Sequence, residues 1–234
     1  MRFGANVVEF GKLAAGLSLA LGGMSLAAAP AVATVLDYSL NDYVGTGSTN
    51  LVSSPYGTVA LDDNGGSNVT VTVTLASGVG FVNTGAGYPL TWDLSGAPDI
   101  PVANITSGFS FDYSSTGSLH TGGAGYWDYA IACSVATCGH GGQSPYTGTL
   151  SFTIDNVTLA DFVANSDSNH FSADVCLGVS GGTCSGGITG VVVANLSSTS
   201  FTTSNTNVPE PASVTILGAA LGTIAFFRRR LRRA

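Results

Sequence analysis

The chain has 234 residues, and only 9% of them are charged, against roughly 25% in an average soluble protein. Its 7 basic residues all lie near the two ends, so the stretch 34–209 contains no Lys or Arg. The same stretch contains 12 of the 14 acidic residues, and all 12 are Asp. That stretch cannot neutralise phosphates, form lysine Schiff bases or clamp anions with arginine, which excludes nucleic acid as a partner.

The first 33 residues have the pattern of a secretory signal peptide. Arg2 and Lys12 are followed by an uncharged run, Leu13–Ala29, rich in Leu, Ala and Gly. Ala31 and Ala33 then form a small-residue A-x-A cleavage motif. We expect the secretion machinery to export the chain and the cut to fall after Ala33. A cut near Ala27–Ala29 and a retained membrane anchor are the alternatives.

Residues 34–196 have the pattern of an all-β passenger domain. Val69, Val71 and Val73 alternate with Thr, the period-2 pattern of a strand with one solvated face. Gly- and Asn-rich turns separate many such runs, so we predict an antiparallel β-sandwich or jelly-roll-like fold. One short helix is expected at 158–163, where Thr158 can cap Asp161. The other predicted strands are 35–40, 57–61, 89–94, 108–113, 126–133, 150–154, 171–177 and 188–196.

The predicted strand 126–133 carries several aromatic residues on one face. Trp127, Tyr129 and Ile131 alternate with Asp128 and smaller residues. Such a row can form a platform on which sugar rings stack. Large apolar side chains at alternate positions are more often core residues, and we favour the core.

Four cysteines occur as two close pairs. In an exported chain they favour two disulfides, and pairing along the sequence gives Cys133–Cys138 and Cys176–Cys184. Two other connectivities are possible. The alternative is a metal site made by Cys133, Cys138 and His140, but the cysteine spacing is at the edge of what zinc sites use. We therefore expect no metal and no other cofactor.

No motif for catalysis is present. The chain has three histidines, His120, His140 and His170, all in polar loops or at strand edges, where solvated histidines are common. It lacks both the G-x-S-x-G and the H-E-x-x-H patterns. The segment 62–68 has the oxygen-rich composition of a calcium loop without EF-hand spacing, and we favour a plain turn. We predict no catalytic residues and no enzymatic activity, with a secreted hydrolase as the weakest alternative.

The last part of the chain has three features in order. A Ser/Thr/Asn-rich linker, 197–207, leads to Val208, Pro209, Glu210 and Pro211. An uncharged run, 212–227, follows. As a helix it would cover about 24 Å, short for a hydrocarbon core of roughly 30 Å. The run ends in a cluster of arginines that we expect to stay in the cytoplasm and to place the passenger outside. The cluster consists of Arg228, Arg229, Arg230, Arg232 and Arg233.

This tripartite end, 208–234, resembles the PEP-CTERM sorting signal of Gram-negative bacteria that make exopolysaccharide. The resemblance implies that an exosortase-like membrane protease recognises Pro209, Glu210 and Pro211. The chain would be anchored transiently in the inner membrane and then released to the cell surface. The same segment is also labelled the ice-binding protein C-terminal domain, which is no evidence for ice binding by this chain. An ordinary single-pass anchor is the alternative.

The sequence thus predicts a non-enzymatic protein of the cell surface or extracellular matrix. The resemblance suggests exopolysaccharide or biofilm as its surroundings. A carbohydrate-binding or ice-binding module is the alternative. Ice binding usually needs a flat, regular array of threonines. We expect Thr70, Thr72 and Thr74 to form one rank with no further ranks in register, which argues against ice binding.

Overall fold

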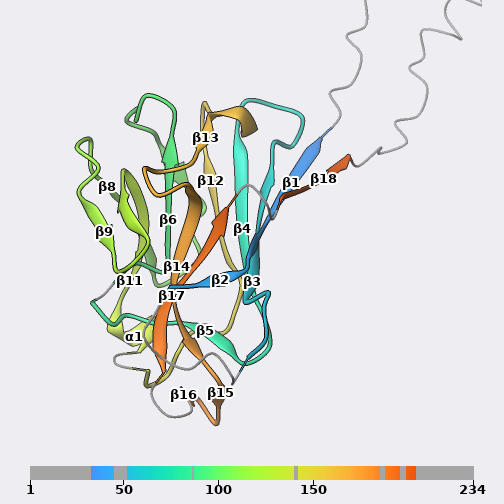
Figure 1. The fold of residues 1–234 in the computed structure, drawn as a ribbon. Coiled ribbons are helices and arrows are strands. Elements are labelled where there is room, and N and C mark those ends of the chain that lie inside the picture. The colour runs from blue at the N-terminus through green and yellow to red at the C-terminus, as the bar shows by residue number, and fades with distance from the viewer. Residues whose placement is uncertain are drawn as a thin grey trace, which may run out of the picture. The chain divides into compact units, whose positions relative to one another are not determined.

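A computed structural model describes residues 33–44, 52–85, 87–139, 142–184, 188–195 and 199–203. These residues form two large antiparallel sheets and two small hairpins (Figure 1). The all-β prediction is therefore confirmed, and the two large sheets give a sandwich-like arrangement. The predicted signal helix and C-terminal helix lie outside the described residues.

The first sheet has six strands. Its edge strand, β18, is the last described strand of the domain and pairs with the first, β1. Thr34 lies opposite Thr203, so the chain enters and leaves this domain at the same sheet edge. In order across the sheet the strands are β18 (Thr199–Thr203), β1 (Thr34–Leu40), β3 (Gly57–Asp62), β4 (Val69–Leu75), β12 (Leu150–Ile154) and β7 (Val102–Ala103).

The second sheet has β14 near its centre, flanked by β17 and β6. The path across it is β2 (Asp42–Tyr43), β17 (Thr189–Asn195), β14 (Asn169–Leu177), β6 (Leu90–Leu94), β11 (Tyr129–Cys133) and β8 (Phe109–Tyr113). Two short strands extend it: β5 (Val79–Phe81) pairs with β14, and β13 (Phe162–Val163) pairs with β6. The small hairpins are β9 (Leu119–Thr121) with β10 (Gly125–Trp127), and β15 (Val179–Ser180) with β16 (Thr183–Cys184).

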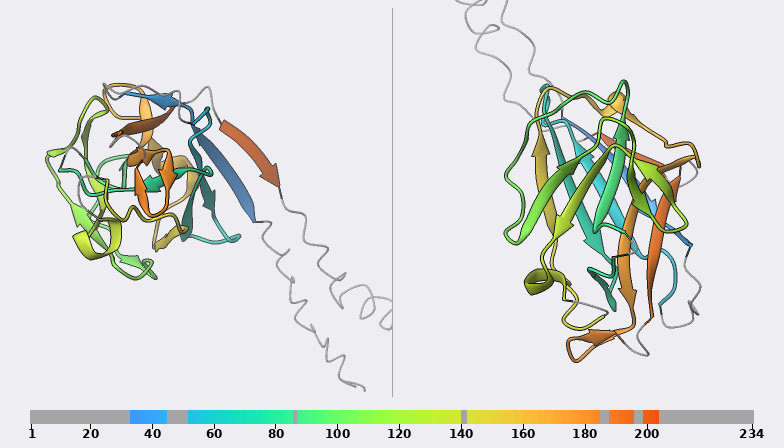
Figure 2. Two further views of the ribbon diagram at one scale, coloured as in Figure 1. Left: turned by 90° about the horizontal axis from the view of Figure 1, so that it is seen from below. Right: turned by 90° about the vertical axis from the view of Figure 1, so that its left-hand side faces the viewer.

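The main core lies between the two sheets, which face each other (Figure 2). Trp92 of β6 packs against Phe152 of β12, with ring centroids 5.1 Å apart. Tyr38 of β1 meets Phe171 of β14 edge-on at 5.0 Å. All these residues are almost fully buried, so aromatic contacts across the interior hold the sheets together.

The outer face of the second sheet is also covered. The β9–β10 hairpin and the segment after β5 pack on it and enclose a smaller apolar cluster around Trp127 and Ala130. As a result every residue of β14 from His170 to Leu177 is buried. The predicted strand 126–133 is divided at Asp128, so that Trp127 lies in this outer cluster and Tyr129 in the main core.

Two predictions need correction. The segment 158–163 forms a single 3-10 turn, Leu159–Asp161, in which the Asp161 carboxylate accepts hydrogen bonds from the Thr158 N–H and hydroxyl. The α-helix of the described residues is instead α1 (Val135–Cys138), one turn inside the Cys133–Cys138 loop. The linker prediction for 197–207 is wrong for Thr199–Thr203, because these residues pair with β1 as β18.

Candidate functional site

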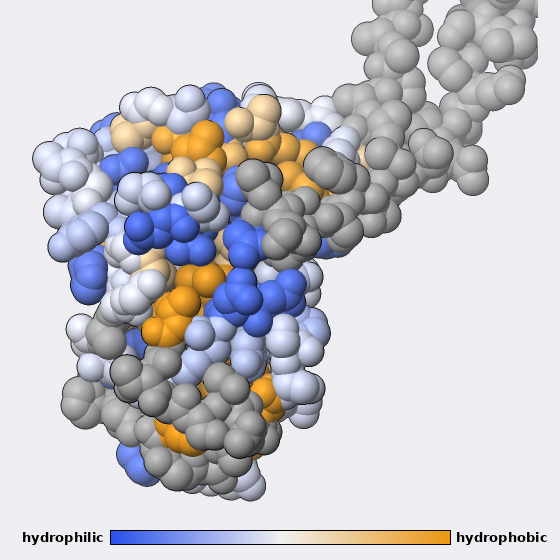
Figure 3. Space-filling view, viewed as in Figure 1, coloured by the Kyte–Doolittle hydropathy of each residue, from blue (hydrophilic) through white to orange (hydrophobic). Residues whose placement is uncertain are grey.

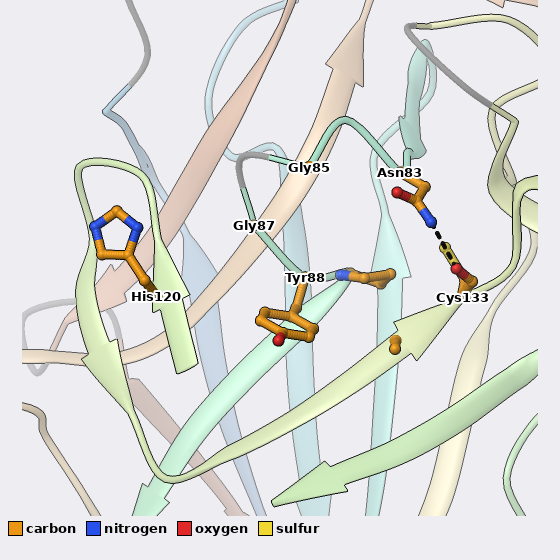
Figure 4. Close-up of a pocket in the computed structure, with 8 residues that line it drawn as sticks. Asn83, Gly85, Gly87, Tyr88, His120 and Cys133 are labelled. Atoms are coloured by element: carbon orange, nitrogen blue, oxygen red, sulfur yellow. Dashed lines mark hydrogen bonds between the residues drawn. The ribbon is translucent and has the colours of Figure 1, made fainter. Parts of the chain in front are cut away.

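A pocket of about 410 Å³ opens on the covered outer face of the second sheet (Figure 4). One wall is the loop between β5 and β6, another is the β9 strand with His120, and β11 supplies the last two residues. The pocket is lined by Asn83, Gly85, Gly87, Tyr88, Pro89, His120, Ala132 and Cys133. No lysine or arginine lines it, which follows from their absence from 34–209.

Asp174 of β14 holds the loop that forms the first wall. Its backbone N–H donates to the Tyr88 carbonyl (2.8 Å), and its carbonyl accepts from the Val82 N–H (3.3 Å). Its carboxylate accepts a hydrogen bond from the Thr84 hydroxyl. On the far side of the pocket the Asn83 amide donates to the Cys133 carbonyl at 2.8 Å (Figure 4). The loop is therefore tied to two different strands of the sheet beneath it.

Two buried oxygens lie against this loop without a hydrogen-bond partner among the described residues. They are Asp174 Oδ1 and Thr121 Oγ1, both on fully buried residues. A Cβ on Gly87 would lie 2.7 Å from Thr121 Cγ2 and 3.5 Å from Asp174 Cβ, so glycine permits the close packing of the loop. Burial raises the pKa of Asp174 to about 6, although the bonds from Thr84 oppose the shift.

Aromatic and polar groups form the exposed rim of the pocket. The ring of His120 lies against that of Tyr126, with centroids 4.9 Å apart, and Tyr126 is 59% exposed. Burial, and after it the charge of the Asp112 carboxylate, raises the pKa of Tyr88. In the space-filling view hydrophobic side chains reach the surface in separate patches among hydrophilic ones (Figure 3). The rim thus offers ring faces and neutral hydrogen-bonding groups, which suit an uncharged polyol better than an anion.

The aromatic residues singled out from the sequence do not belong to this rim. Trp127, Tyr129 and Ile131 are fully buried, which confirms the core interpretation. Sequence reasoning missed Tyr88, which is half-buried at the pocket, and Tyr126, which is exposed. Two glycines precede Tyr88, Gly85 and Gly87, and they are a signal of a loop that packs closely, but nothing in the sequence indicates what the loop packs against.

The histidines differ from one another. His120 is exposed on the pocket rim, whereas His170 is buried and stacks on Tyr38 with centroids 5.2 Å apart. The expectation of a solvated histidine is wrong for His170, which is buried. The pairing of β14 with β17 shifts register between Asn169 and Phe171, so His170 lies in a bulge. Burial lowers the pKa of His170. His140 lies outside the described residues.

One pair of carboxyl groups stands out in the structure although the sequence does not distinguish it. The Asp128 N–H donates to Asp93 Oδ1 at 2.7 Å. Burial raises the pKa of Asp93 to about 6, with a further contribution from the charge of Asp128, and burial also raises the pKa of Asp128. Neither residue lines the pocket. The backbone bond explains their proximity as a structural feature of the bend before β11.

The cysteines pair along the sequence, Cys133 with Cys138 and Cys176 with Cys184. The elements that contain Cys138 and Cys184, α1 and β16, lie at the lower end of the domain in Figure 1, away from β18. The segment that follows the first loop contacts the second disulfide, since the Cys184 N–H donates to the Gly142 carbonyl at 3.0 Å. Two disulfides are typical of an oxidising compartment outside the cytoplasm. No group of three His, Cys, Asp or Glu in the described ranges is placed to hold a metal ion.

The turn 62–66 uses its carboxylates for the backbone. Asp62 Oδ1 accepts from the Asn64 N–H at 2.8 Å, and Asp63 Oδ1 accepts from the Gly65 N–H at 2.9 Å. Asn64 has a φ of 49° and Gly65 a φ of 69°, which is the left-handed backbone of a tight turn. These contacts agree with the plain turn that the sequence favours.

The threonine rank on β4 has neighbours in register, contrary to the sequence-based expectation. Thr74 lies opposite Thr58 of β3, and Thr70 lies opposite Thr153 of β12. Asp62, however, also lies opposite Thr70, so a carboxylate interrupts the array. The outer face of the first sheet therefore carries a small patch of hydroxyl groups rather than a long regular lattice.

The predicted signal peptide up to residue 32, the sorting motif 208–211, the run 212–227 and the arginine cluster lie outside the described residues. Within the described part of the chain no helix is long and apolar enough to cross a membrane. Comparison with protein-family models, with curated proteins and with solved structures found no match for this chain.

Proposed function

We propose that the chain is an exported, non-enzymatic protein of the cell surface or extracellular matrix, sorted by an exosortase-like membrane protease. Its jelly-roll-like passenger would be carried outside the cytoplasm by the signal peptide and held briefly in the inner membrane by the C-terminal helix. The proposed partners are the secretion machinery, the processing enzyme and extracellular polysaccharide.

One observation carries this proposal: a domain without any Lys or Arg, closed by two disulfides, lies between two basic terminal segments. Cations at the ends match what export and sorting machineries use. The disulfides fit an oxidising compartment. An acidic domain without cations stays soluble among neutral polymers and would bind anionic ones only through divalent cations.

Cell fractionation in a Gram-negative host that makes exopolysaccharide tests the sorting. The wild-type passenger is expected in the surface and matrix fractions, and Glu210→Ala is expected to leave it in the inner membrane. Ser213→Ala, a change beyond the motif, serves as the control and should behave like the wild type. An unchanged distribution of the Glu210→Ala variant would refute recognition of the motif.

The pocket rim favours a second candidate, binding of a neutral polysaccharide. His120 lines the pocket with Asn83 and Tyr88, and its ring lies tilted against the exposed ring of Tyr126. No Lys or Arg occurs in residues 34–209. Electrophoresis through gels containing cellulose derivatives, xylan or β-glucan measures such binding. Tyr126→Ala should weaken it by about tenfold, as for an interface residue worth more than about 1 kcal/mol. Val135→Ala, at another exposed apolar residue (57% exposed), is the matched control.

A further inference from the structure

The backbone nitrogen of Thr34 lies against a carboxylate. Thr34 is the first residue of β1, and its N–H donates to Asp63 Oδ1 over 2.8 Å. In return the Asp63 N–H donates to the Thr34 carbonyl at 3.2 Å. The end of β1 is thus held by a side chain and by the backbone of the same aspartate.

The Asp63 carboxylate is fixed in place independently of Thr34. The same oxygen accepts the Gly65 N–H at 2.9 Å, and the Asp63 carbonyl accepts the Gly66 N–H at 2.8 Å. The tight turn between β3 and β4 therefore presents this oxygen to the first nitrogen of β1. A preorganised acceptor loses little conformational freedom when it binds a donor.

The cleavage motif places the cut at this same nitrogen. Hydrolysis of the Ala33–Thr34 bond by a membrane signal peptidase consumes one water, leaves a carboxylate on Ala33 and frees the amino group of Thr34, which takes up a proton. We propose that Asp63 is the binding site for this new α-ammonium. Processing would then replace a hydrogen bond from an uncharged amide N–H with an ion pair. This inference rests on the proposed export and on cleavage after Ala33.

The pair has no competitor within the passenger. Residues 34–209 contain no Lys or Arg, so the new α-ammonium is the only cation, apart from protonated histidine, that this stretch offers to its 12 aspartates. A cut after Ala29 would leave the Thr34 nitrogen as an amide and Asp63 without a charged partner.

The composition makes this amine measurable. The only lysine is Lys12, which the cut removes, so the processed chain has one primary amine, that of Thr34. The processed protein recovered from the host is treated with formaldehyde and a borohydride reductant, which methylate amines, across a range of pH. The reaction should be about two- to fivefold slower near pH 7 in the folded wild type than in Asp63→Asn, the strength of a partly exposed ion pair. In Asp63→Asn the pH at which the methylation rate is half its maximum should return towards the usual pKa range of an α-amino group, about 7.7–8.0.

Asp62→Asn is the matched control, since Asp62 bonds the Asn64 N–H and not Thr34. It should react like the wild type, and hydrogen–deuterium exchange of β1 verifies that both variants fold. Peptide mass spectrometry locates the label. Label on Thr34 with equal rates in wild type and Asp63→Asn would overturn the ion pair while leaving export intact. Label on Lys12 or on Pro30 would show instead that cleavage after Ala33, and with it this part of the proposed processing, is wrong.

Discussion

The outer faces of the two sheets differ in their exposure to solvent. On β4 the outward residues Thr70, Thr72 and Thr74 are partly or fully exposed, while Val69, Val71 and Val73 are completely buried. On β14 the outward residues Ser172 and Asp174 are as buried as their inward neighbours. The same alternation of polar and apolar residues thus produces a solvated face on one sheet and a buried polar layer on the other.

The difference arises from what lies above each sheet. The loop after β5 and the β9–β10 hairpin cover the second sheet, so its polar groups must find partners inside the protein. Thr91 and Ser172 do so by sharing a hydrogen bond, 2.5 Å between their oxygens. Asp174 and Thr121 satisfy this need only in part, and it is beside them that the pocket forms. The loop after β5 and the β9–β10 hairpin therefore lower stability, because they bury unpaired polar groups, and they also form the candidate site.

The largest effect should come from placing one new carboxylate on each outer face. Ser172→Asp buries a charge beside Thr91 without a cation to pair it, so we expect a loss of about 4 kcal/mol in the free energy of unfolding, or failure to fold. Thr74→Asp adds the same group on the exposed face and should cost less than about 1 kcal/mol. Urea unfolding of both variants measures the difference. Equal losses would show that the second face is not covered.

The next effect concerns the disulfide that joins β14 to the β15–β16 hairpin. Cys176 and Cys184 form a small buried cluster with Val82, which precedes the pocket loop. Replacing both cysteines with Ala should lower the free energy of unfolding by about 3 kcal/mol. Thermal unfolding of the oxidised proteins is the measurement. A loss below about 1 kcal/mol in the free energy of unfolding would mean that this disulfide contributes little to holding the pocket loop on the second sheet.

A smaller effect should appear in the pH dependence of stability. Burial raises the pKa of Asp174 to about 6, above the value of about 3.9 in an unfolded chain. Between these values the folded state binds more protons, so the group lowers stability as pH rises from about 4 to about 6. Asp174→Asn should remove about 1–3 kcal/mol of this loss.

The comparison of variant with wild type isolates Asp174. Asp93 contributes with the same sign, because burial raises its pKa too, whereas the lowered pKa of His170 makes stability fall as pH drops through its usual titration range. Both effects cancel in the difference between the two proteins. Unfolding titrations at pH 4, 5, 6 and 7 give that difference. A constant difference would contradict a buried titrating carboxyl at position 174.

The smallest effect is expected on the exposed face. The in-register threonines around Thr72 form a patch that Asp62 interrupts, so we expect no inhibition of ice recrystallisation by the wild type. Thr72→Val should then change neither this assay nor, by more than about 0.5 kcal/mol, the stability. Strong inhibition that Thr72→Val abolishes would assign ice binding to this face.

Local patterns predicted much of this fold because they act over a few residues. The period-2 runs at Val69–Leu75 and Leu150–Ile154 gave the strand positions, and close spacing gave the pairing of Cys133 with Cys138. Short edge elements such as β2 and β18 depend on the strands that they join, so their residues carry no pattern of their own.

The candidate site was not predictable for the same reason. It depends on a loop from one segment lying over Asp174 and beside His120 from two others, and no local pattern records that meeting. Asp174 looks like a solvated strand residue in the sequence, and only the cover above it makes it a buried group. His170 was misassigned likewise, because the bulge that accompanies its burial is set by the partner strand β17.

The intact mass of the protein recovered from its host tests the central proposal of export and sorting most directly. We predict a chain that begins at Thr34, ends near Pro209 and is lighter than its reduced form by the four hydrogens that two disulfides remove. A chain that still carries Arg228–Arg233, or one with free thiols and an intact N-terminus, would contradict the account.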